Sequence, residues 1–208
     1  MDRSQLQFLS DDLTTASVDV VRDRLLDLFC QLAYQEGDFV LSSGQKSSYY
    51  INGKQVTLHP FGALAIGRLL CGMLASDTSA VAGLTLGADP IVSAVSVVSA
   101  YENKPVYALI IRKEAKGHGT RAYIEGPQLE NGAKVVVLED VVTTGQSALK
   151  AVTRLQDAGY HVEEIISLVD RQQGGAELYA EKGLKFQALF TIEDLKTRTS
   201  QLKKGNGE

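Results

Sequence analysis

The chain has 208 residues, of which 44% are hydrophobic, a composition that predicts one main domain around one substantial core. Its formal net charge of −4 excludes the broad basic surface that nucleic-acid binding requires, so any anionic ligand must meet a local basic cluster. The two cysteines, Cys30 and Cys71, are too few for a disulfide framework and are expected to be buried thiols. No stretch reaches the ~18 apolar residues of a membrane span, which predicts a soluble, cytoplasmic protein without membrane partners.

The N-terminal part of the chain divides into a leader, a helix and a small hood. Residues 1–17 are polar and are expected to form a flexible leader. Apolar residues then recur at helical spacing through residues 18–35. Two short strand-like runs follow at 39–41 and 49–51, and the polar stretch between them indicates an antiparallel pair. We assign residues 18–60 to this helix and hood.

Helical and strand-like patterns alternate in the remainder of the chain, which we assign to a core at 61–200 and a flexible tail at 201–208. In chain order we expect a helix at 61–75, a strand at 80–84, a helix at 90–100, strands at 105–111 and 134–139, a helix at 146–158, a strand at 163–169, a helix at 175–182 and a strand at 185–190. Such alternation predicts an α/β fold with a mostly parallel, twisted sheet flanked by helices. Sheets of this kind bind ligands at the carboxyl ends of their strands.

One of these carboxyl ends carries the strongest functional pattern. The strand at 134–139 ends in two carboxylates, Glu139 and Asp140, and a Thr/Gly/Ser loop then opens the next helix. Backbone N–H groups of residues 143–147 would meet the positive end of that helix, which favours a phosphate group, and Gly145 would let the backbone approach it closely. The carboxylates could accept hydrogen bonds from vicinal sugar hydroxyls. The alternative is an ordinary helix cap beside two solvated carboxylates.

A second cluster follows the preceding predicted strand. Residues 112–121 contain four basic residues and one acidic residue, a formal charge of +3 in an acidic protein. Glycines on both sides of His118 would leave this loop mobile, so that it could close over pyrophosphate during a reaction. The alternative is a solvated basic loop without a ligand.

The two clusters together resemble a known family. The stretch from Lys134 to Ser147 is similar to the signature with which type I phosphoribosyltransferases bind phosphoribosyl pyrophosphate (PRPP). The loop matches the Arg-Lys-x-x-Lys-x-His pattern of orotate phosphoribosyltransferases, where purine phosphoribosyltransferases differ, through Arg112, Lys113, Lys116 and His118. The segments 39–50 and 169–171 also resemble that family, so the similarity runs from about Phe39 to Gly175.

The resemblance implies a type I phosphoribosyltransferase fold and the transfer of ribose 5-phosphate from PRPP to orotate. It implies Lys116 and His118 as catalytic residues, and Thr143 and Arg171 as orotate ligands. It also implies Mg²⁺ carried by PRPP rather than by direct protein ligands, and a homodimer whose subunits share their active sites. The residues that it assigns to PRPP binding are Arg112, Lys113, Lys116, His118, Glu139, Asp140, Val141, Val142, Thr143, Thr144, Gly145, Gln146 and Ser147.

The chemistry of orotate fits Arg171, because a carboxylate favours a guanidinium partner. The alternative for this arginine is an ion pair with Asp170 or another acid. Tyr49 and Tyr50 point to opposite faces of their strand, so only one can line a pocket. The family alignment favours Tyr50, while filling of the space under the hood is an equal alternative for either tyrosine.

Two positions depart from many bacterial members of the family, which have lysines where this chain has Ser42 and Gly87. Lys54 is a candidate to replace part of the lost charge. Two other functions are compatible with the pattern. One is phosphoribosyl transfer to another base, and the other is a non-catalytic regulator that senses PRPP. The intact Lys116 and His118 favour an enzyme over a regulator.

Overall fold

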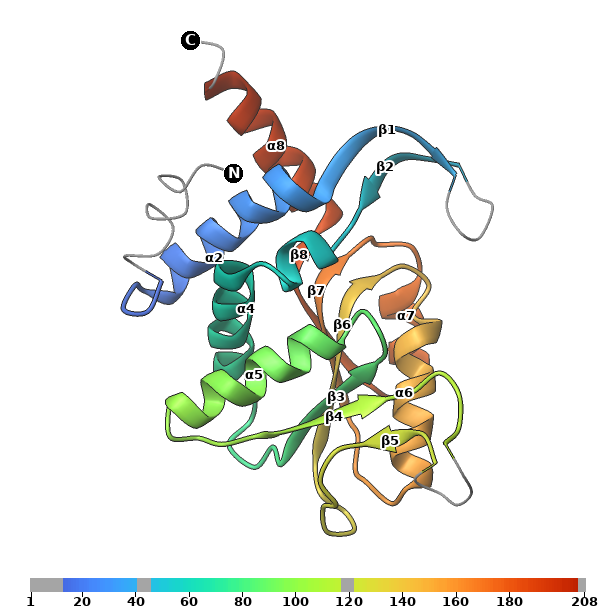
Figure 1. Cartoon of the computed structure of the whole chain (residues 1–208). Coiled ribbons are helices and arrows are strands. Elements are labelled where there is room, and N and C mark those ends of the chain that lie inside the picture. Colours follow the sequence, from blue (N-terminus) through green and yellow to red (C-terminus); the bar gives the residue numbers. More distant parts are fainter. Residues whose placement is uncertain (1–12, 41–45, 117–121, 206–208) are drawn as a thin grey trace.

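The computed structural model describes residues 13–40, 46–116 and 122–205. Its centre is a six-stranded sheet with the strand order β5-β4-β3-β6-β7-β8 (Figure 1). Neighbouring strands are parallel except for β4 and β5, so the predicted mostly parallel sheet is confirmed. The strands are β3 (Ala80–Leu84), β4 (Tyr107–Ile111), β5 (Ile124–Glu125), β6 (Val135–Val142), β7 (Glu164–Asp170) and β8 (Lys185–Thr191).

The order of the strands reverses at β3. The chain passes from β3 to β4 and β5 on one side, and β6 then pairs with β3 on its other side. The carboxyl ends of β3 and β6 therefore flank a topological switch point, which is where α/β sheets bind their ligands.

Helices cover both faces of the sheet. The helices α4 (Pro60–Met73) and α5 (Asp89–Tyr101) pack on one face, and α6 (Gln146–Asp157) and α7 (Gly175–Glu181) pack on the other (Figure 1). The apolar run of β6 serves both, because Val136 and Leu138 join the first cluster and Val135 and Val137 join the second. Burial on both faces explains why this strand is continuously apolar.

The predicted flexible leader is wrong for residues 13–17. Leu13 is buried, and the guanidinium of Arg68 donates hydrogen bonds to the backbone carbonyls of Leu13 and Ala16. The hydroxyl of Ser17 accepts a hydrogen bond from the backbone N–H of Val20 at 3.4 Å and so caps α2 (Val18–Leu28). These contacts order the segment, while residues 1–12 lie outside the described residues.

The helix predicted at 18–35 ends earlier than its apolar pattern. The helix α2 continues only into a π-helical turn, η1 (Phe29–Ala33), and β1 (Tyr34–Val40) begins at once. The strand takes over because β1 pairs with β2 (Lys46–Ile51) from Tyr34 onward. The predicted antiparallel hood is therefore present as a β1–β2 hairpin, which projects from the body of the molecule (Figure 1).

The predicted flexible tail is also wrong for residues 201–205, which belong to α8 (Ile192–Gly205). Thr191 and Asp194 cap this helix reciprocally, since each backbone N–H donates to the other's side chain, at 2.8 and 3.2 Å. Lys203 pairs with Glu36 of β1 at 2.6 Å, which fixes the last turn to the hairpin. Residues 206–208 lie outside the described residues.

Among the described residues, no helix combines the length and the apolarity needed to cross a lipid bilayer. Cys30 is buried, Cys71 is half-buried, and both are free thiols. Burial raises the pKa of both thiols, that of Cys71 to about 11, so both are protonated at neutral pH.

Candidate active site

Glu139 lies at the switch point, near the end of β6. Its side chain is buried, and its Oε2 has no hydrogen-bond partner among the described residues. Burial raises the pKa of Glu139 well above its usual range, and the neighbouring charge of Asp140 adds to this shift. The charge of Lys113 acts in the opposite direction, so the basic loop lies within electrostatic reach of this carboxyl group. A buried carboxyl group with an open acceptor is suited to a ligand that brings hydroxyl groups or a cation.

The carboxylate of Asp140 accepts a hydrogen bond from one backbone N–H and is approached by two glycines. Its Oδ1 accepts a hydrogen bond from the backbone N–H of Val141 at 2.9 Å. A Cβ at Gly87 would lie only 2.8 Å from Oδ2 of Asp140, and one at Gly53 would lie 3.5 Å away. The loop after β3 thus reaches Asp140 because residue 87 has no side chain. Gly87 is one of the two positions at which many bacterial members of the resembling family have lysine.

Ser42 is the second position at which many bacterial members have lysine, and Lys54 is the candidate to replace part of the lost charge. Ser42 lies outside the described residues. Lys54 opens the short helix α3 (Lys54–Thr57) and directly follows Gly53, the glycine that approaches Asp140. The side chain of Lys54 is exposed, and its role in replacing the lost charge stays a prediction.

The predicted phosphate loop turns the chain from β6 into α6 at Gly145, which has a left-handed φ of 80°. No side chain of the described residues caps the first turn of α6, which leaves its N–H groups to a ligand. A cavity of about 100 Å³ lies at this turn. It is lined by Glu139, Val141, Val142, Thr143, Thr144, Gly145, Gln146, Ser147, Ala148 and Tyr179. The structure thus brings almost the whole predicted segment 139–147 to one pocket.

Tyr179 of α7 is the residue of this pocket that the sequence did not indicate. Its side chain is fully buried, and its hydroxyl has no hydrogen-bond partner among the described residues. A Cβ at Gly145 would lie 2.8 Å from Cε1 of its ring, so the ring packs directly against the turn. In the sequence, one tyrosine in a predicted helix looks the same as any core aromatic residue.

The base of the basic loop lies at the carboxyl end of β4. Arg112 pairs with Glu125 of β5 at 3.0 Å, and Lys116 lies 3.9 Å from the same carboxylate. The guanidinium of Arg154 in α6 donates to the backbone carbonyls of Arg112 and Lys113. The helix that opens at the phosphate loop therefore also holds the base of the basic loop. Glu125 and Arg154 were not indicated by the sequence, and the predicted catalytic His118 lies outside the described residues.

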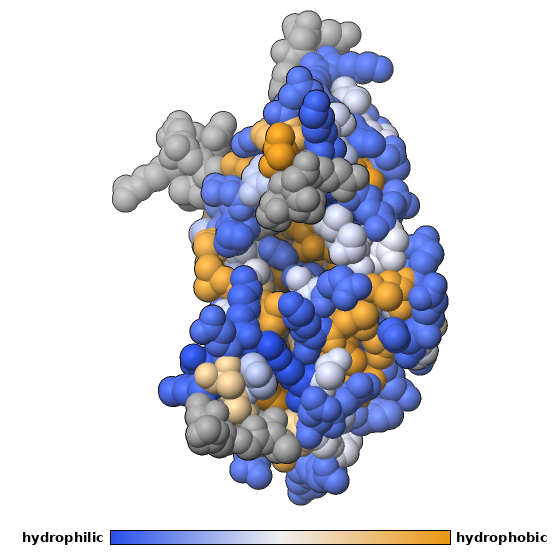
Figure 2. All heavy atoms as spheres, turned by 90° about the vertical axis from the view of Figure 1, so that its right-hand side faces the viewer, coloured by the Kyte–Doolittle hydropathy of each residue, from blue (hydrophilic) through white to orange (hydrophobic). Residues whose placement is uncertain are grey.

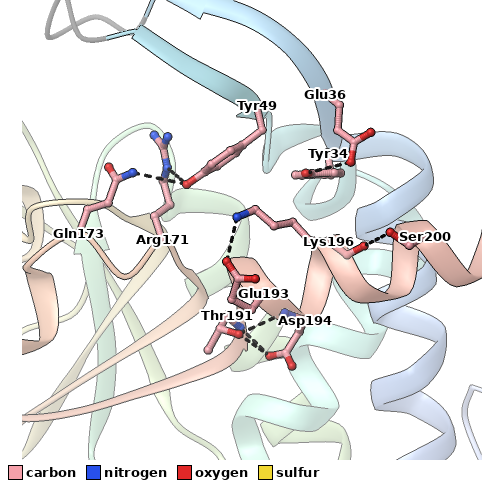
Figure 3. Close-up of polar contacts among 10 residues, drawn as sticks. All are labelled: Tyr34, Glu36, Tyr49, Arg171, Gln173, Thr191, Glu193, Asp194, Lys196 and Ser200. Atoms are coloured by element: carbon pink, nitrogen blue, oxygen red, sulfur yellow. Dashed lines mark hydrogen bonds and ion pairs between the residues drawn. The ribbon is translucent and has the colours of Figure 1, made fainter.

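Arg171 follows β7 and has only 8% of its surface exposed. Its backbone N–H donates to the carbonyl of Val142 at 2.9 Å, which places it beside Thr143, the other predicted orotate ligand. Among the described residues it forms no ion pair with Asp170 or any other acid. Its Nε instead donates to the hydroxyl of Tyr49 at 3.2 Å (Figure 3). Its Nη2 donates to the hydroxyl of Ser47 at 3.3 Å.

The two tyrosines of β2 do lie on opposite sides. Tyr49 is buried and contacts Arg171, whereas Tyr50 is 42% exposed and its ring lies 5.7 Å from that of Phe39. The tyrosine that contacts Arg171 is thus Tyr49.

Figure 2 shows the side of the molecule that lies on the right in Figure 1, toward which β4 runs. Hydrophilic side chains predominate on this side and surround apolar patches.

No family model matches the chain. An orotate phosphoribosyltransferase from Nostoc sp. is 77% identical to it over 188 residues, which cover 90% of this chain and 91% of that protein. One from Synechocystis sp. is 70% identical over 183 residues, which cover 88% of this chain and 92% of that protein. The crystal structure of Mycobacterium tuberculosis orotate phosphoribosyltransferase in complex with PRPP has a TM-score of 0.71 and 36% identity, and the match covers 85% of this chain and 99% of that one.

These similarities extend over most of each compared chain, and they agree with a parallel sheet that carries a phosphate-loop pocket at its switch point. The protein therefore belongs to the orotate phosphoribosyltransferase family.

Proposed function

We propose that PRPP and orotate bind together at the carboxyl ends of β3, β6 and β7, with Arg171 as the ligand of the orotate carboxylate. The observation that carries this proposal is the environment of Arg171. Arg171 is buried, and its guanidinium has no carboxylate partner among the described residues. Its backbone N–H donates to the carbonyl of Val142, in the strand that ends in the phosphate loop. A buried cation of this kind requires an anion in the functional state.

Family membership makes the chain a transferase of pyrimidine biosynthesis. The reaction joins orotate to the ribose 5-phosphate group of PRPP and yields orotidine 5′-monophosphate and pyrophosphate. The anomeric carbon gains positive charge as pyrophosphate departs. Catalysis therefore depends on stabilising the leaving anion and on holding the base in line. Orotate is already an anion with a nucleophilic ring nitrogen, so no strong protein base is required.

For PRPP, we assign the 5-phosphate to the pocket formed by residues 141–147, whose free N–H groups suit an anion. Glu139 and Asp140 would accept hydrogen bonds from the ribose hydroxyls. Arg112, Lys113, Lys116 and His118 would meet the pyrophosphate, with Lys116 and His118 stabilising it as it leaves. The ion pairs of Arg112 and Lys116 with Glu125 support this role, since a more strongly charged pyrophosphate could displace the single carboxylate.

Magnesium would enter the site bound to the pyrophosphate of PRPP. Its preferred ligands are oxygens, which the pyrophosphate and ribose groups of PRPP would supply, and Glu139 and Asp140 would hold the ribose hydroxyls beside it. When bound, the ion neutralises charge on the departing pyrophosphate.

A homodimer with shared active sites also belongs to the proposal. Large apolar side chains are exposed on α5 and at the start of β4, where Val97, Tyr101 and Tyr107 have 71%, 88% and 57% of their surface accessible. Exposed apolar residues gathered on neighbouring elements mark a surface that binds another protein. The basic loop follows the carboxyl end of β4, at the other end of the strand from Tyr107, and would have to extend from there to reach the site of a second subunit. We place the protein in the cytoplasm, where its free thiols would stay reduced.

Steady-state kinetics of two variants test the site. Arg171→Ala should raise KM for orotate by about 10- to 150-fold, the effect of a hydrogen bond to a charged group, with little change in KM for PRPP. Asp140→Asn should show the opposite pattern, and Arg171→Lys, which keeps the charge without the planar fork, should be intermediate. Equal effects of Arg171→Ala on both substrates would contradict the assignment of orotate to this residue.

A further inference from the structure

The guanidinium of Arg171 is held along one specific edge. Its Nε donates to the hydroxyl of Tyr49 at 3.2 Å, and its Nη2 donates to the hydroxyl of Ser47 at 3.3 Å. Nε and Nη2 form the side-on fork of an arginine, so β2 occupies that fork with two hydroxyls. The end-on edge, formed by Nη1 and the second hydrogen of Nη2, makes no hydrogen bond to any described residue. It is the edge that remains for a bidentate carboxylate.

The Tyr49 side chain is itself fixed from several sides. Gln173 donates to the same hydroxyl at 3.4 Å, and the ring centroid lies 4.7 Å from Cζ of Arg171, within the range of a cation–π contact. Lys196 of α8 points toward the ring, with its Nζ 5.6 Å from the centroid and paired with Glu193 at 2.8 Å (Figure 3). The tyrosine is therefore a buried group with several contacts rather than an exposed surface group.

Ser47 is coupled to the tyrosine within the strand. Its hydroxyl donates to the carbonyl of Tyr49 at 2.7 Å while it accepts from Arg171. The hydroxyl hydrogen of Ser47 is thus engaged by the backbone, and its oxygen accepts from the guanidinium and, at 3.4 Å, from the backbone N–H of Tyr49. The two acceptors that meet Arg171 come from one strand of a projecting hairpin, and they join that hairpin to the end of β7.

We infer that Tyr49 is a positioning residue for orotate: its hydroxyl holds the side-on edge of Arg171 so that the end-on edge is presented to the carboxylate of the substrate. Ser47 assists in the same role. This inference rests on the proposed function of Arg171 and adds to it the residues that orient the guanidinium. Neither hydroxyl needs to touch the substrate.

Steady-state kinetics of Tyr49→Phe test the inference, because this change removes the hydroxyl and keeps the ring. KM for orotate should rise about tenfold, while kcat and KM for PRPP change less than about twofold. Tyr34→Phe is the matched control. Tyr34 lies in the same hairpin with its ring 6.0 Å from that of Tyr49, but its hydroxyl bonds to Glu36 instead of Arg171. The control should leave KM for orotate unchanged.

A double-mutant cycle decides whether Tyr49 acts through Arg171. In the Arg171→Ala background, adding Tyr49→Phe should change KM for orotate by less than about twofold, because the group it positions is gone. A further rise of about tenfold in that background would overturn the inference and assign Tyr49 a direct contact with orotate. Unchanged KM for orotate in Tyr49→Phe would also overturn it.

Ser47→Ala is a second test if Tyr49→Phe is unstable, and thermal unfolding of each variant shows whether it is folded. Ser47→Ala should raise KM for orotate, as Tyr49→Phe does, and leave KM for PRPP unchanged. An unchanged KM for orotate in Ser47→Ala would count against the inference.

Failure of the proposed function is a separate outcome. In that case Arg171→Ala itself would not show a selective effect on orotate, whereas failure of the positioning role leaves the selective effect of Arg171→Ala intact.

Discussion

Replacing Gly145 by alanine tests the phosphate loop where its geometry is most demanding. Gly145 has a φ of +80°, and a Cβ there would lie 2.8 Å from Cε1 of Tyr179. A left-handed backbone costs a residue with a side chain about 1–2 kcal/mol, and an extra methyl group in filled space costs about 1–3 kcal/mol. Gly145→Ala should therefore lower the free energy of unfolding by about 2–5 kcal/mol.

Gly183 supplies a matched control. Its φ is +72°, but apart from its own chain neighbours no atom of the described residues lies within 4 Å of an added Cβ. Gly183→Ala should cost only the backbone contribution of about 1–2 kcal/mol. Urea unfolding followed by circular dichroism measures both values. Kinetics at a temperature where both variants are folded should show a raised KM for PRPP in Gly145→Ala alone, because only that substitution displaces the proposed phosphate cradle.

Two results would refute this reasoning. Equal destabilisation by the two substitutions would mean that the Tyr179 ring does not restrict residue 145. An unchanged KM for PRPP in a folded but destabilised Gly145→Ala variant would mean that the turn does not hold the 5-phosphate.

Three further predictions concern charge, metal and assembly. Glu139→Gln should weaken PRPP binding yet raise thermal stability at neutral pH. Because burial raises the pKa of Glu139 above the usual 4.5, the folded state keeps a proton that the unfolded state loses, so the wild type loses stability as pH rises from about 4.5 to the folded pKa. Thermal melts between pH 4 and pH 8 should show the gain from glutamine growing over that interval, and a variant less stable than wild type at pH 8 would count against it. Chelation of Mg²⁺ should abolish turnover and weaken PRPP binding measured by calorimetry, both restored by added Mg²⁺; full activity in chelator would exclude the metal's role. Mixing Lys116→Ala with Asp140→Asn under subunit exchange, at a PRPP concentration far below the KM of Asp140→Asn, should restore about a quarter of wild-type activity if the loop acts across the dimer. A mixture that remains inactive despite proven exchange would exclude shared sites.

The parts of the site that were predictable from the sequence are those that lie within one continuous segment. Residues 139–147 form a strand end, a turn and a helix start, so their local pattern determines most of their geometry. The structure adds the long-range contacts. Tyr179 enters the pocket from α7, and Tyr49 reaches Arg171 across 122 positions of the chain. Such contacts depend on how the elements pack, which no local pattern contains.

The same distinction explains the fold. Alternating apolar patterns predicted the parallel strands and their helices, because each pattern reflects burial of one element. The predicted boundaries of the leader and the tail were wrong because long-range contacts hold residues that a local pattern leaves free. Arg68 donates to the carbonyls of Leu13 and Ala16, and Glu36 pairs with Lys203. The helical cap formed by Thr191 and Asp194 was visible in the sequence as a Thr-x-x-Asp pattern, and it would have predicted the start of α8.

The measurement that tests the central claim most directly is base selection by the purified protein. The protein is mixed with PRPP and Mg²⁺ and with orotate, uracil, adenine or hypoxanthine, and loss of free base and release of pyrophosphate are followed together. Our account predicts that orotate is consumed with one pyrophosphate released per orotate, and that Arg171→Ala loses this preference because the contact to the carboxylate is gone. Turnover of a base without a carboxylate at a rate equal to that of orotate, or binding of PRPP with no turnover of any base, would contradict it.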